Sequence, residues 1–289
     1  MFEAIRITTT LLKLRISFAI AMSALVGMLA ADGAFSMLKA TVFALAVLGA
    51  AGAVSAFNHY YERAGDRLMV RTRGRPFARG TLKPGVVWPI TFLGLLVASL
   101  AMAAAVGGTL AAVFVFLGAF TYGIVYTVWL KRRSVWNIVV GGAAGSFAIL
   151  AGAAVVEPNM QATPILLAIV MFLWTPPHFW SLAAAKGDDY RNAGVPMLPN
   201  VVSERVWTSL ILGHTVLLAV LSLVPLAFGM GPVYGIFAAV GGGLFAWRSW
   251  QLFRAPSHKT AYANFKASLI QFSLLTTGVF VDTGIKWAF

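Results

Sequence analysis

Nine long apolar stretches constrain the fold of this chain more than any other feature of its sequence. They run approximately over residues 16–31, 38–61, 86–106, 109–130, 136–156, 164–184, 206–228, 233–252 and 269–287. A helix of roughly 20 apolar residues crosses the hydrocarbon core of a bilayer. Helices satisfy their own backbone hydrogen bonds in lipid, and the stretches lack the period-two alternation of barrel strands. We therefore predict an all-α, polytopic membrane protein: a bundle of about nine transmembrane helices forming a single domain over residues 1–289.

The composition supports this prediction. The chain is 60% hydrophobic and only 11% charged, whereas a soluble domain carries about a quarter charged residues. The absence of Cys excludes disulfides, thiolate metal sites and Cys nucleophiles. The net charge of +13 would suit nucleic acid, but the basic residues lie in short loops, which indicates topogenic charge and attraction to membrane lipid instead. The first apolar stretch is too long for a signal peptide, so we expect a retained span.

The positive charges predict an orientation. All but two of the 22 Lys and Arg residues lie in the N-terminal segment or around the loops after the second, fourth, sixth and eighth stretches. The exceptions are Lys39 and Lys286. Cytoplasmic loops carry such an excess of Lys and Arg. We therefore expect the N-terminus and these loops on the cytoplasmic side of the inner membrane, with the active site on that face.

A first polar motif closes the second apolar stretch. Asn58, Glu62 and Asp66 recur every four residues, which places them on one face of a helix. Carboxylates at this spacing repel each other unless a cation lies between them. Mg²⁺ suits such oxygen ligands and completes its shell with substrate phosphate, and Arg71 and Arg75 follow as phosphate-binding residues. The motif predicts a diphosphate site; the alternative is a solvated helix end followed by topogenic arginines.

A second motif, Trp-Thr-Pro-Pro-His-Phe-Trp, occupies residues 174–180. Pro176 and Pro177 are expected to break or bend the helix, which is tolerated where the backbone lines a cavity. His178 follows directly, and ionisable residues inside membranes are functional candidates. The alternative is an interfacial histidine bonded to backbone. His59, off the face of the first motif, and His214, alone within a span, are weaker candidates.

Two neighbouring carboxylates lie about ten residues beyond His178. Asp188 and Asp189 begin the loop after the sixth stretch. They are candidates for a second Mg²⁺ ligand set that faces the first motif. The alternative is a helix cap within an exposed loop.

Together these motifs resemble the UbiA superfamily of intramembrane prenyltransferases. Residues 58–66 with Arg71-Thr72 and Arg75-Pro76 are similar to its first Asp-rich motif. Segments 126–142, 174–180 and 189–199 resemble the branch that farnesylates protohaem. Departures are Ala64-Gly65, where members usually have an acidic residue, the run 146–149, where members often carry prolines, and the lack of a full second pair of spaced aspartates.

The resemblance implies farnesyl diphosphate as donor, protohaem IX as acceptor, haem O as product after water addition, and Mg²⁺ as cofactor. It implies catalytic roles for Asn58, Glu62, Asp66 and His178, with His178 contacting the haem iron or a propionate. The implied metal ligands are Asn58, Glu62, Asp66, Asp188 and Asp189. The implied substrate contacts are Arg71, Arg75, Lys131, Arg132, Tyr126, Asn137, Lys186 and Tyr190. Docking with haem A synthase or a terminal oxidase is left open.

Three other functions compete with this interpretation. A quinone-pathway prenyltransferase would act on an aromatic acid, but the Trp-Thr-Pro-Pro-His run argues against it. A transporter would place charges and broken helices at the midplane in inverted repeats, whereas the charges here cluster at one face. A haem carrier without catalysis would leave the diphosphate motif without a purpose.

Overall fold

The computed structural model describes residues 2–288, which form helices and connecting loops with no strand among them. The first half contains α1 (Phe2–Leu11), α2 (Leu14–Ala30), α3 (Met37–Tyr61), α4 (Arg63–Asp66), α5 (Pro76–Arg79), α6 (Val87–Phe120) and the π-helix η1 (Thr121–Leu130). The second half contains α7 (Asn137–Val156), α8 (Ala162–Ala185), α9 (Gly187–Asn192), α10 (Leu198–Val201), α11 (Glu204–Leu221), the 3₁₀-helix η2 (Val224–Phe228), α12 (Pro232–Arg254) and α13 (His258–Ala288). The predicted all-α class is confirmed.

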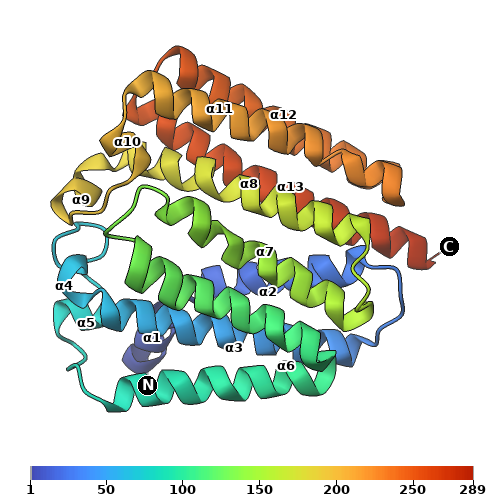
Figure 1. Cartoon of the computed structure of the whole chain (residues 1–289), viewed down its shortest axis with the longest axis horizontal. Coiled ribbons are helices and arrows are strands. Elements are labelled where there is room, and N and C mark those ends of the chain that lie inside the picture. Colours follow the sequence, from blue (N-terminus) through green and yellow to red (C-terminus); the bar gives the residue numbers. More distant parts are fainter. Residues whose placement is uncertain (1, 289) are drawn as a thin grey trace.

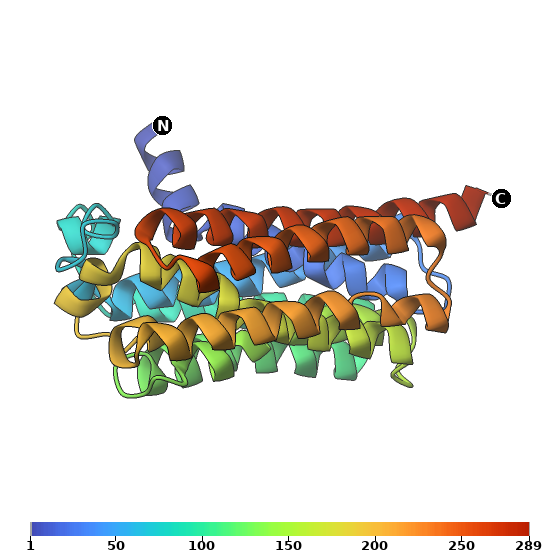
Figure 2. The same ribbon diagram turned by 90° about the horizontal axis from the view of Figure 1, so that it is seen from above.

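The long helices lie side by side in one bundle, and the short helices gather at one end of it. Figure 1 shows α4, α5, α9 and α10 at the left end, and the C-terminus at the opposite end. Figure 2 shows α1 standing away from the bundle near the same end as the short helices. The axes of α1 and α2 differ by 50°, and the bend falls at Lys13, whose φ of 45° is left-handed. The two polar loops predicted to carry function therefore meet at one end, which we call the loop end.

Gly108 reverses the direction of the chain inside α6. Its φ of 80° and ψ of 175° lie outside the helical region, in a conformation that glycine adopts readily and other residues do not. The segment before it runs away from the loop end, and the segment after it, continued by η1, runs back (Figure 1). The third and fourth apolar stretches are therefore separate rods joined by a single glycine.

Small residues bring α2 and α7 into backbone contact. A Cβ atom on Gly27 would lie 1.9 Å from the backbone oxygen of Ile149, and one on Gly152 would lie 1.8 Å from that of Ala24. Glycine at both positions is therefore required by the packing, as is common between helices in membranes. This contact fixes the N-terminal helix α2 against the centre of the bundle.

Within residues 2–288, six helices are long and apolar enough to cross a membrane, or seven if the bent pair of α1 and α2 counts as one span. One of the six, Val87–Leu130, contains the reversal at Gly108. Many large apolar side chains face outward along the helices, among them Phe18, Leu93, Phe116 and Ile236. Such a surface suits lipid rather than water. The chain has the architecture of an integral membrane protein, and the count of nine spans stays a prediction.

The helix α8 passes through Pro176 and Pro177 without interruption, so the prolines do not break it; a bend, the other predicted outcome, stays a prediction. Both prolines are buried. The hydroxyl of Thr175 donates to the carbonyl of Met171 (3.1 Å), and the indole N–H of Trp174 donates to the carbonyl of Ser268 on α13 (2.9 Å). Packing against neighbouring helices and side-chain bonds of this kind let membrane helices tolerate proline.

Candidate active site

A cavity of about 530 Å³ opens among α2, α3, the second rod of α6, η1, α7 and α8. Its lining changes along the bundle. Near the loop end it carries four cationic side chains, which are Lys13, Arg71, Arg75 and Lys131, and one carboxylate, Asp66. Deeper positions on the same helices are apolar and include Ile20, Val47, Phe114, Val115 and Ala148. The cavity therefore combines a cationic mouth with an apolar interior, which suits an amphiphile with an anionic head.

The two polar loops bind each other directly across the mouth. The carboxylate of Asp189 on α9 accepts hydrogen bonds from the backbone N–H groups of Val70 (2.9 Å) and Arg71 (3.3 Å). The guanidinium of Arg71 in turn donates to the hydroxyl of Tyr190 (3.4 Å). The sequence places these loops more than 100 residues apart, and the fold joins them around one hollow.

The ladder of Asn58, Glu62 and Asp66 keeps helical spacing although α3 ends at Tyr61. The N–H of Glu62 donates to the carbonyl of Asn58 (2.9 Å), and the N–H of Asp66 donates to that of Glu62 (2.8 Å). The one-turn helix α4 thus continues the pitch of α3. All three residues are buried, with 2%, 3% and 1% of their surface exposed. The predicted common face exists, and it points into the protein rather than into solvent.

Each ladder residue is bonded to a cationic side chain. Lys13 Nζ donates to Asn58 Oδ1 (2.9 Å) and to the hydroxyl of Tyr122 (2.8 Å). Arg75 Nη1 lies 2.9 and 2.8 Å from the two carboxylate oxygens of Asp66.

The carboxylate of Glu62 is shared by Lys131 (2.7 Å) and Arg132 (3.1 Å), both on its Oε2 atom. Burial alone would raise the pKa of Glu62, but these two cations outweigh it and hold that pKa below its usual value. The second oxygen, Oε1, is buried and has no hydrogen-bond partner among the described residues. Glu62 does not itself line the cavity, in contrast to Asn58 and Asp66, and Oε1 is the oxygen that it has left for a cation.

The residues fit a magnesium ion that is bound together with a phosphate. Within residues 2–288, no three His, Asp or Glu side chains lie close enough to form a metal site by themselves. The ladder offers one amide oxygen and two carboxylates, and Mg²⁺ in proteins takes one or two carboxylates and completes its shell with water and substrate phosphates. The orphaned Oε1 of Glu62 and the cavity-facing Asn58 and Asp66 supply that chemistry.

The π-helix η1 turns three functional side chains to the cavity. Its wider turn bonds the N–H of Lys131 to the carbonyl of Tyr126 five residues back (2.9 Å). Nine residues separate Tyr122 from Lys131; an α-helix would put them on opposite faces, whereas a π-helix, with roughly 4.4 residues per turn, puts them on one face. Tyr122 and Tyr126 stack with ring centroids 5.7 Å apart, and all three residues line the cavity.

Several predicted residues lie near the cavity without lining it. Arg132 joins Glu62 to the carbonyl of Ala193 (3.1 Å), and Asn137 donates to the carbonyls of Ser134 (2.6 Å) and Pro196 (3.4 Å). Both therefore fasten the loops together. Lys186 is exposed.

The second predicted metal set divides between two environments. The side chain of Asp188 is 82% exposed and pairs with Arg191, whereas both oxygens of Asp189 are taken up by backbone N–H groups. Neither residue lines the cavity. Their role as metal ligands stays a prediction. The hydrogen bonds of Asp189 join the two polar loops beside the mouth of the cavity.

His178 lies on the side of α8 that packs against α13. Its ring stacks on Trp174 with centroids 4.2 Å apart, and its Nδ1 lies 2.7 Å from the hydroxyl of Ser268. The cavity lining reaches α8 only at Thr175 and Phe179. The proposed contact of His178 with haem therefore lacks a direct path from this cavity.

Sequence reasoning missed the cavity residues Lys13 and His59, and also Tyr122, which accepts a hydrogen bond from Lys13. Lys13 was counted only as a topogenic charge, yet the bend after α1 aims its amine at Asn58. His59 is a weaker candidate from the sequence because it lies off the ladder face, yet it lines the cavity beside Asn58. A signal for Lys13 and His59 was the rarity of ionisable residues beside apolar stretches.

The fold and this site define an integral membrane protein whose helices enclose a cavity with a cationic mouth and an apolar interior. Residues 20–275 match the UbiA prenyltransferase family, and the chain belongs to that family. It is 52% identical over 279 residues to protoheme IX farnesyltransferase 2 of Paramagnetospirillum magneticum, covering 96% of this chain and 97% of that protein. It is 45% identical to protoheme IX farnesyltransferase 1 of the same organism, covering 94% and 96%.

Solved structures show the same fold. A digeranylgeranylglyceryl phosphate synthase superposes with a TM-score of 0.79 at 17% identity, covering 97% of this chain and 99% of that one. A UbiA homologue from Archaeoglobus fulgidus, bound to GPP and Mg²⁺, superposes with a TM-score of 0.69 at 14% identity, covering 95% and 99%. Membership of the family makes this chain a prenyltransferase enzyme rather than a transporter or a passive carrier.

Proposed function

We propose that this chain transfers the farnesyl group of farnesyl diphosphate to a vinyl group of protohaem IX, with addition of water, to give haem O. The observation that carries the proposal is a cavity that combines a cationic mouth with an apolar interior. The relatives that are 52% and 45% identical over nearly their whole length carry the name protoheme IX farnesyltransferase. An aromatic-acid prenyltransferase is not favoured, because these relatives are named for farnesyl transfer to protohaem.

The proposed magnesium site uses Asn58, Glu62 and Asp66. Their oxygen chemistry and the orphaned Oε1 of Glu62 support this assignment, and a solved family relative is described as bound to GPP and Mg²⁺. The ion, when bound, would neutralise charge that builds on the leaving diphosphate. Asp188 and Asp189 stay candidates for a second ion.

The cationic side chains at the mouth would bind the diphosphate oxygens. Arg71 and Arg75 face the cavity from the loop between α4 and α5, and Lys131 faces it from the end of η1. Charged donors of this kind stabilise the negative charge that grows as the C–O bond breaks. Arg75 would exchange part of its bond with Asp66 for the phosphate. The departing diphosphate takes the bonding electron pair with it.

The apolar part of the cavity would hold the farnesyl chain and keep water from the allylic cation. The vinyl π electrons of protohaem then form the new C–C bond. Water adds to the cation left on the haem side chain and loses a proton, which gives a hydroxyethylfarnesyl group. The apolar walls from α2, α3, the second α6 rod and α7 supply this exclusion.

An acceptor comparison tests the proposal. Membranes containing the chain would be incubated with farnesyl diphosphate, Mg²⁺ and either protohaem IX or an aromatic acid of the quinone pathway. We expect a farnesylated product from protohaem alone, detected by mass spectrometry, and none when Mg²⁺ is removed with EDTA. A product from the aromatic acid alone would overturn the assignment.

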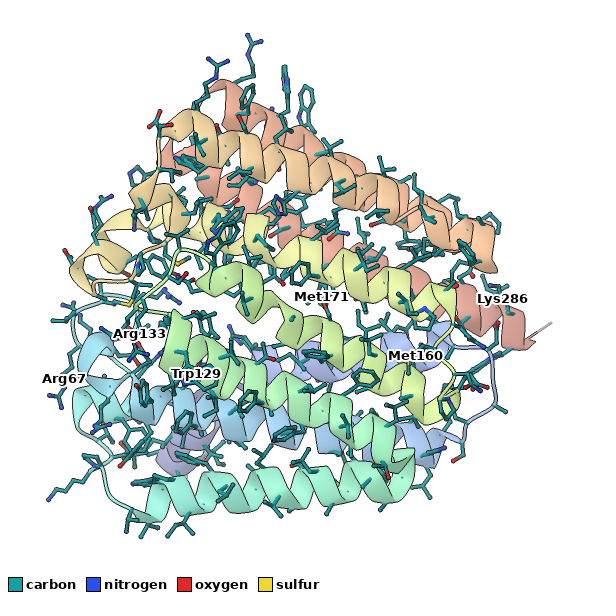
Figure 3. All side chains as sticks on the ribbon, in the orientation of Figure 1. Arg67, Trp129, Arg133, Met160, Met171 and Lys286 are labelled. Atoms are coloured by element: carbon teal, nitrogen blue, oxygen red, sulfur yellow. The ribbon has the colours of Figure 1, made fainter. Side chains whose placement is uncertain are left out.

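We further propose that residues 1–289 act as one domain in the inner membrane, with the cavity mouth on the cytoplasmic side. The excess of Lys and Arg around the loop end supports this orientation. Figure 3 labels Arg67 and Arg133 at that end and Lys286 at the opposite one. Docking to haem A synthase or a terminal oxidase stays a prediction.

A further inference from the structure

His59 is a buried polar side chain that the fold leaves without a partner. Only 2% of its surface is exposed. Neither ring nitrogen has a hydrogen-bond partner among the described residues. Buried polar groups are nearly always hydrogen-bonded, and a buried group left unsatisfied costs free energy of folding. A buried histidine with two unpaired nitrogens does not stabilise the fold through hydrogen bonds. We therefore look for a ligand that would bond to its ring.

The cavity beside His59 is the one that contains the proposed diphosphate site. His59 lines it together with Asn58, the first residue of the ladder. The charges that act most strongly on the imidazole are positive and come from Lys13, Arg75 and Lys131. All three of these cations line the same cavity.

This surrounding selects the kind of ligand that would satisfy the ring. A positively charged ligand at the His59 ring is disfavoured, because Lys13, Arg75 and Lys131 already face the same space. Mg²⁺ also prefers oxygen to imidazole ligands. An anion with several acceptor oxygens fits, because an imidazole N–H donates to it while the cations balance its charge.

We propose that His59 is a catalytic residue whose ring N–H donates a hydrogen bond to a phosphate oxygen of the departing diphosphate. This inference rests on the proposed farnesyl transfer and adds one donor to it. The bond strengthens as negative charge collects on the leaving group, so it would stabilise the transition state and the bound pyrophosphate product. The free protein would keep the nitrogens unpaired until that anion arrives.

The test measures binding of inorganic pyrophosphate with Mg²⁺ to the purified, detergent-solubilised full chain by titration calorimetry. His59→Leu removes both nitrogens at similar volume, whereas His59→Gln and His59→Asn each return an N–H near one ring nitrogen. We expect His59→Leu to weaken binding roughly 10- to 100-fold, the range for one lost bond to a charged group. Either the Gln or the Asn variant should recover most of that loss.

The matched control is His214→Leu, because His214 bonds only the carbonyl of Leu210 on its own helix (2.8 Å). It should bind pyrophosphate as the wild type does. The thermal unfolding temperature separates function from packing: His59→Leu should unfold no earlier than the wild type, since it removes two unsatisfied atoms.

Two results would overturn the inference. One is pyrophosphate affinity unchanged in His59→Leu; the other is a loss that neither the Gln nor the Asn variant recovers, which would assign a packing role. Farnesyl transfer to protohaem is assayed alongside. A wild-type chain that binds pyrophosphate through His59 but never farnesylates protohaem would remove the proposed acceptor and leave the role of His59 standing.

Discussion

Asp66 illustrates how a single side chain serves both the free and the proposed working states of the site. It is 1% exposed, lines the cavity and is held by Arg75 at 2.8 Å. A carboxylate fixed in this way is already in place for a metal ion, and its arginine is already in place for a phosphate. The ion pair therefore keeps two functional groups ordered before substrate arrives.

We predict that Asp66→Asn lowers farnesyl transfer on the order of 100-fold, as expected for loss of one charged group at the reacting centre. The amide keeps the size of the side chain but binds neither Mg²⁺ nor Arg75 as strongly. Product would be measured by mass spectrometry at equal protein content of the membranes. Asp32→Asn, an exposed carboxylate elsewhere, is the control. Unchanged turnover in Asp66→Asn would refute the metal assignment.

Gly65 belongs to the Ala64-Gly65 pair at which this chain departs from the family pattern, and its surroundings leave no room for a side chain. A Cβ on Gly65 would lie 1.7 Å from Nη2 of Arg132. The same guanidinium bonds Glu62 and the carbonyl of Ala193. The missing side chain therefore makes room for an arginine that ties the ladder to the second loop.

Gly65→Ala should push Arg132 away from Glu62 and lower farnesyl transfer roughly 3- to 10-fold, within the range of coupling energies between contacting residues. In an Arg132→Ala background the same change should have little further effect. Initial rates of the four proteins form the test, with Gly85→Ala, where a Cβ meets nothing within 4 Å, as control. Additive losses would contradict the account.

At the scale of elements, the sequence predicted helices well and their irregularities poorly. The apolar stretches located the rods, including the two on either side of Gly108, because hydrophobicity reports burial in lipid directly. Hydrophobicity carries no signal for the π-helix η1, and a 3.6-residue period would have placed Lys131 away from Tyr122. Pro176 and Pro177 do not break α8 for a related reason. Packing against neighbouring helices compensates for the prolines, and the local sequence does not report that packing.

The candidate site shows the same division. The spacing of Asn58, Glu62 and Asp66 was visible in the sequence because all three lie on consecutive turns. The approach of Lys13 to Asn58 depends on a bend between α1 and α2 and on helix packing. A local sequence pattern predicts neither the bend nor the packing. Contacts between distant segments therefore required the three-dimensional structure.

The reversal at Gly108 yields a prediction for stability. Gly108→Ala places a Cβ at φ 80° and ψ 175°, a backbone region that is essentially restricted to glycine and costs another residue roughly 1–3 kcal/mol. The variant should unfold at a lower temperature in detergent. Gly94→Ala in the same element, where the added Cβ meets nothing within 4 Å, should be neutral or stabilising. Equal unfolding temperatures for the two variants would contradict the assigned strain.

For the whole molecule, the cationic mouth of the cavity lies at the loop end, where Figure 3 labels Arg67 and Arg133. The chain has no native Cys, so single cysteines report topology cleanly. Arg73 is exposed at the loop end, and Asn159 is exposed in the loop between α7 and α8 at the opposite end. The two test variants are Arg73→Cys and Asn159→Cys. A membrane-impermeant maleimide added to intact spheroplasts should label only Asn159→Cys. Labelling of Arg73→Cys instead would reverse the orientation.

The central claim is that one membrane-embedded cavity brings a prenyl diphosphate to haem. Mass spectrometry of haem extracted from cells expressing the chain tests it most directly, with cells expressing Asp66→Asn as reference. We expect a species heavier than protohaem by one farnesyl unit plus one water, present with the wild-type chain and absent with the variant. Protohaem of unchanged mass in both cultures, with the chain present in the membrane, would contradict it.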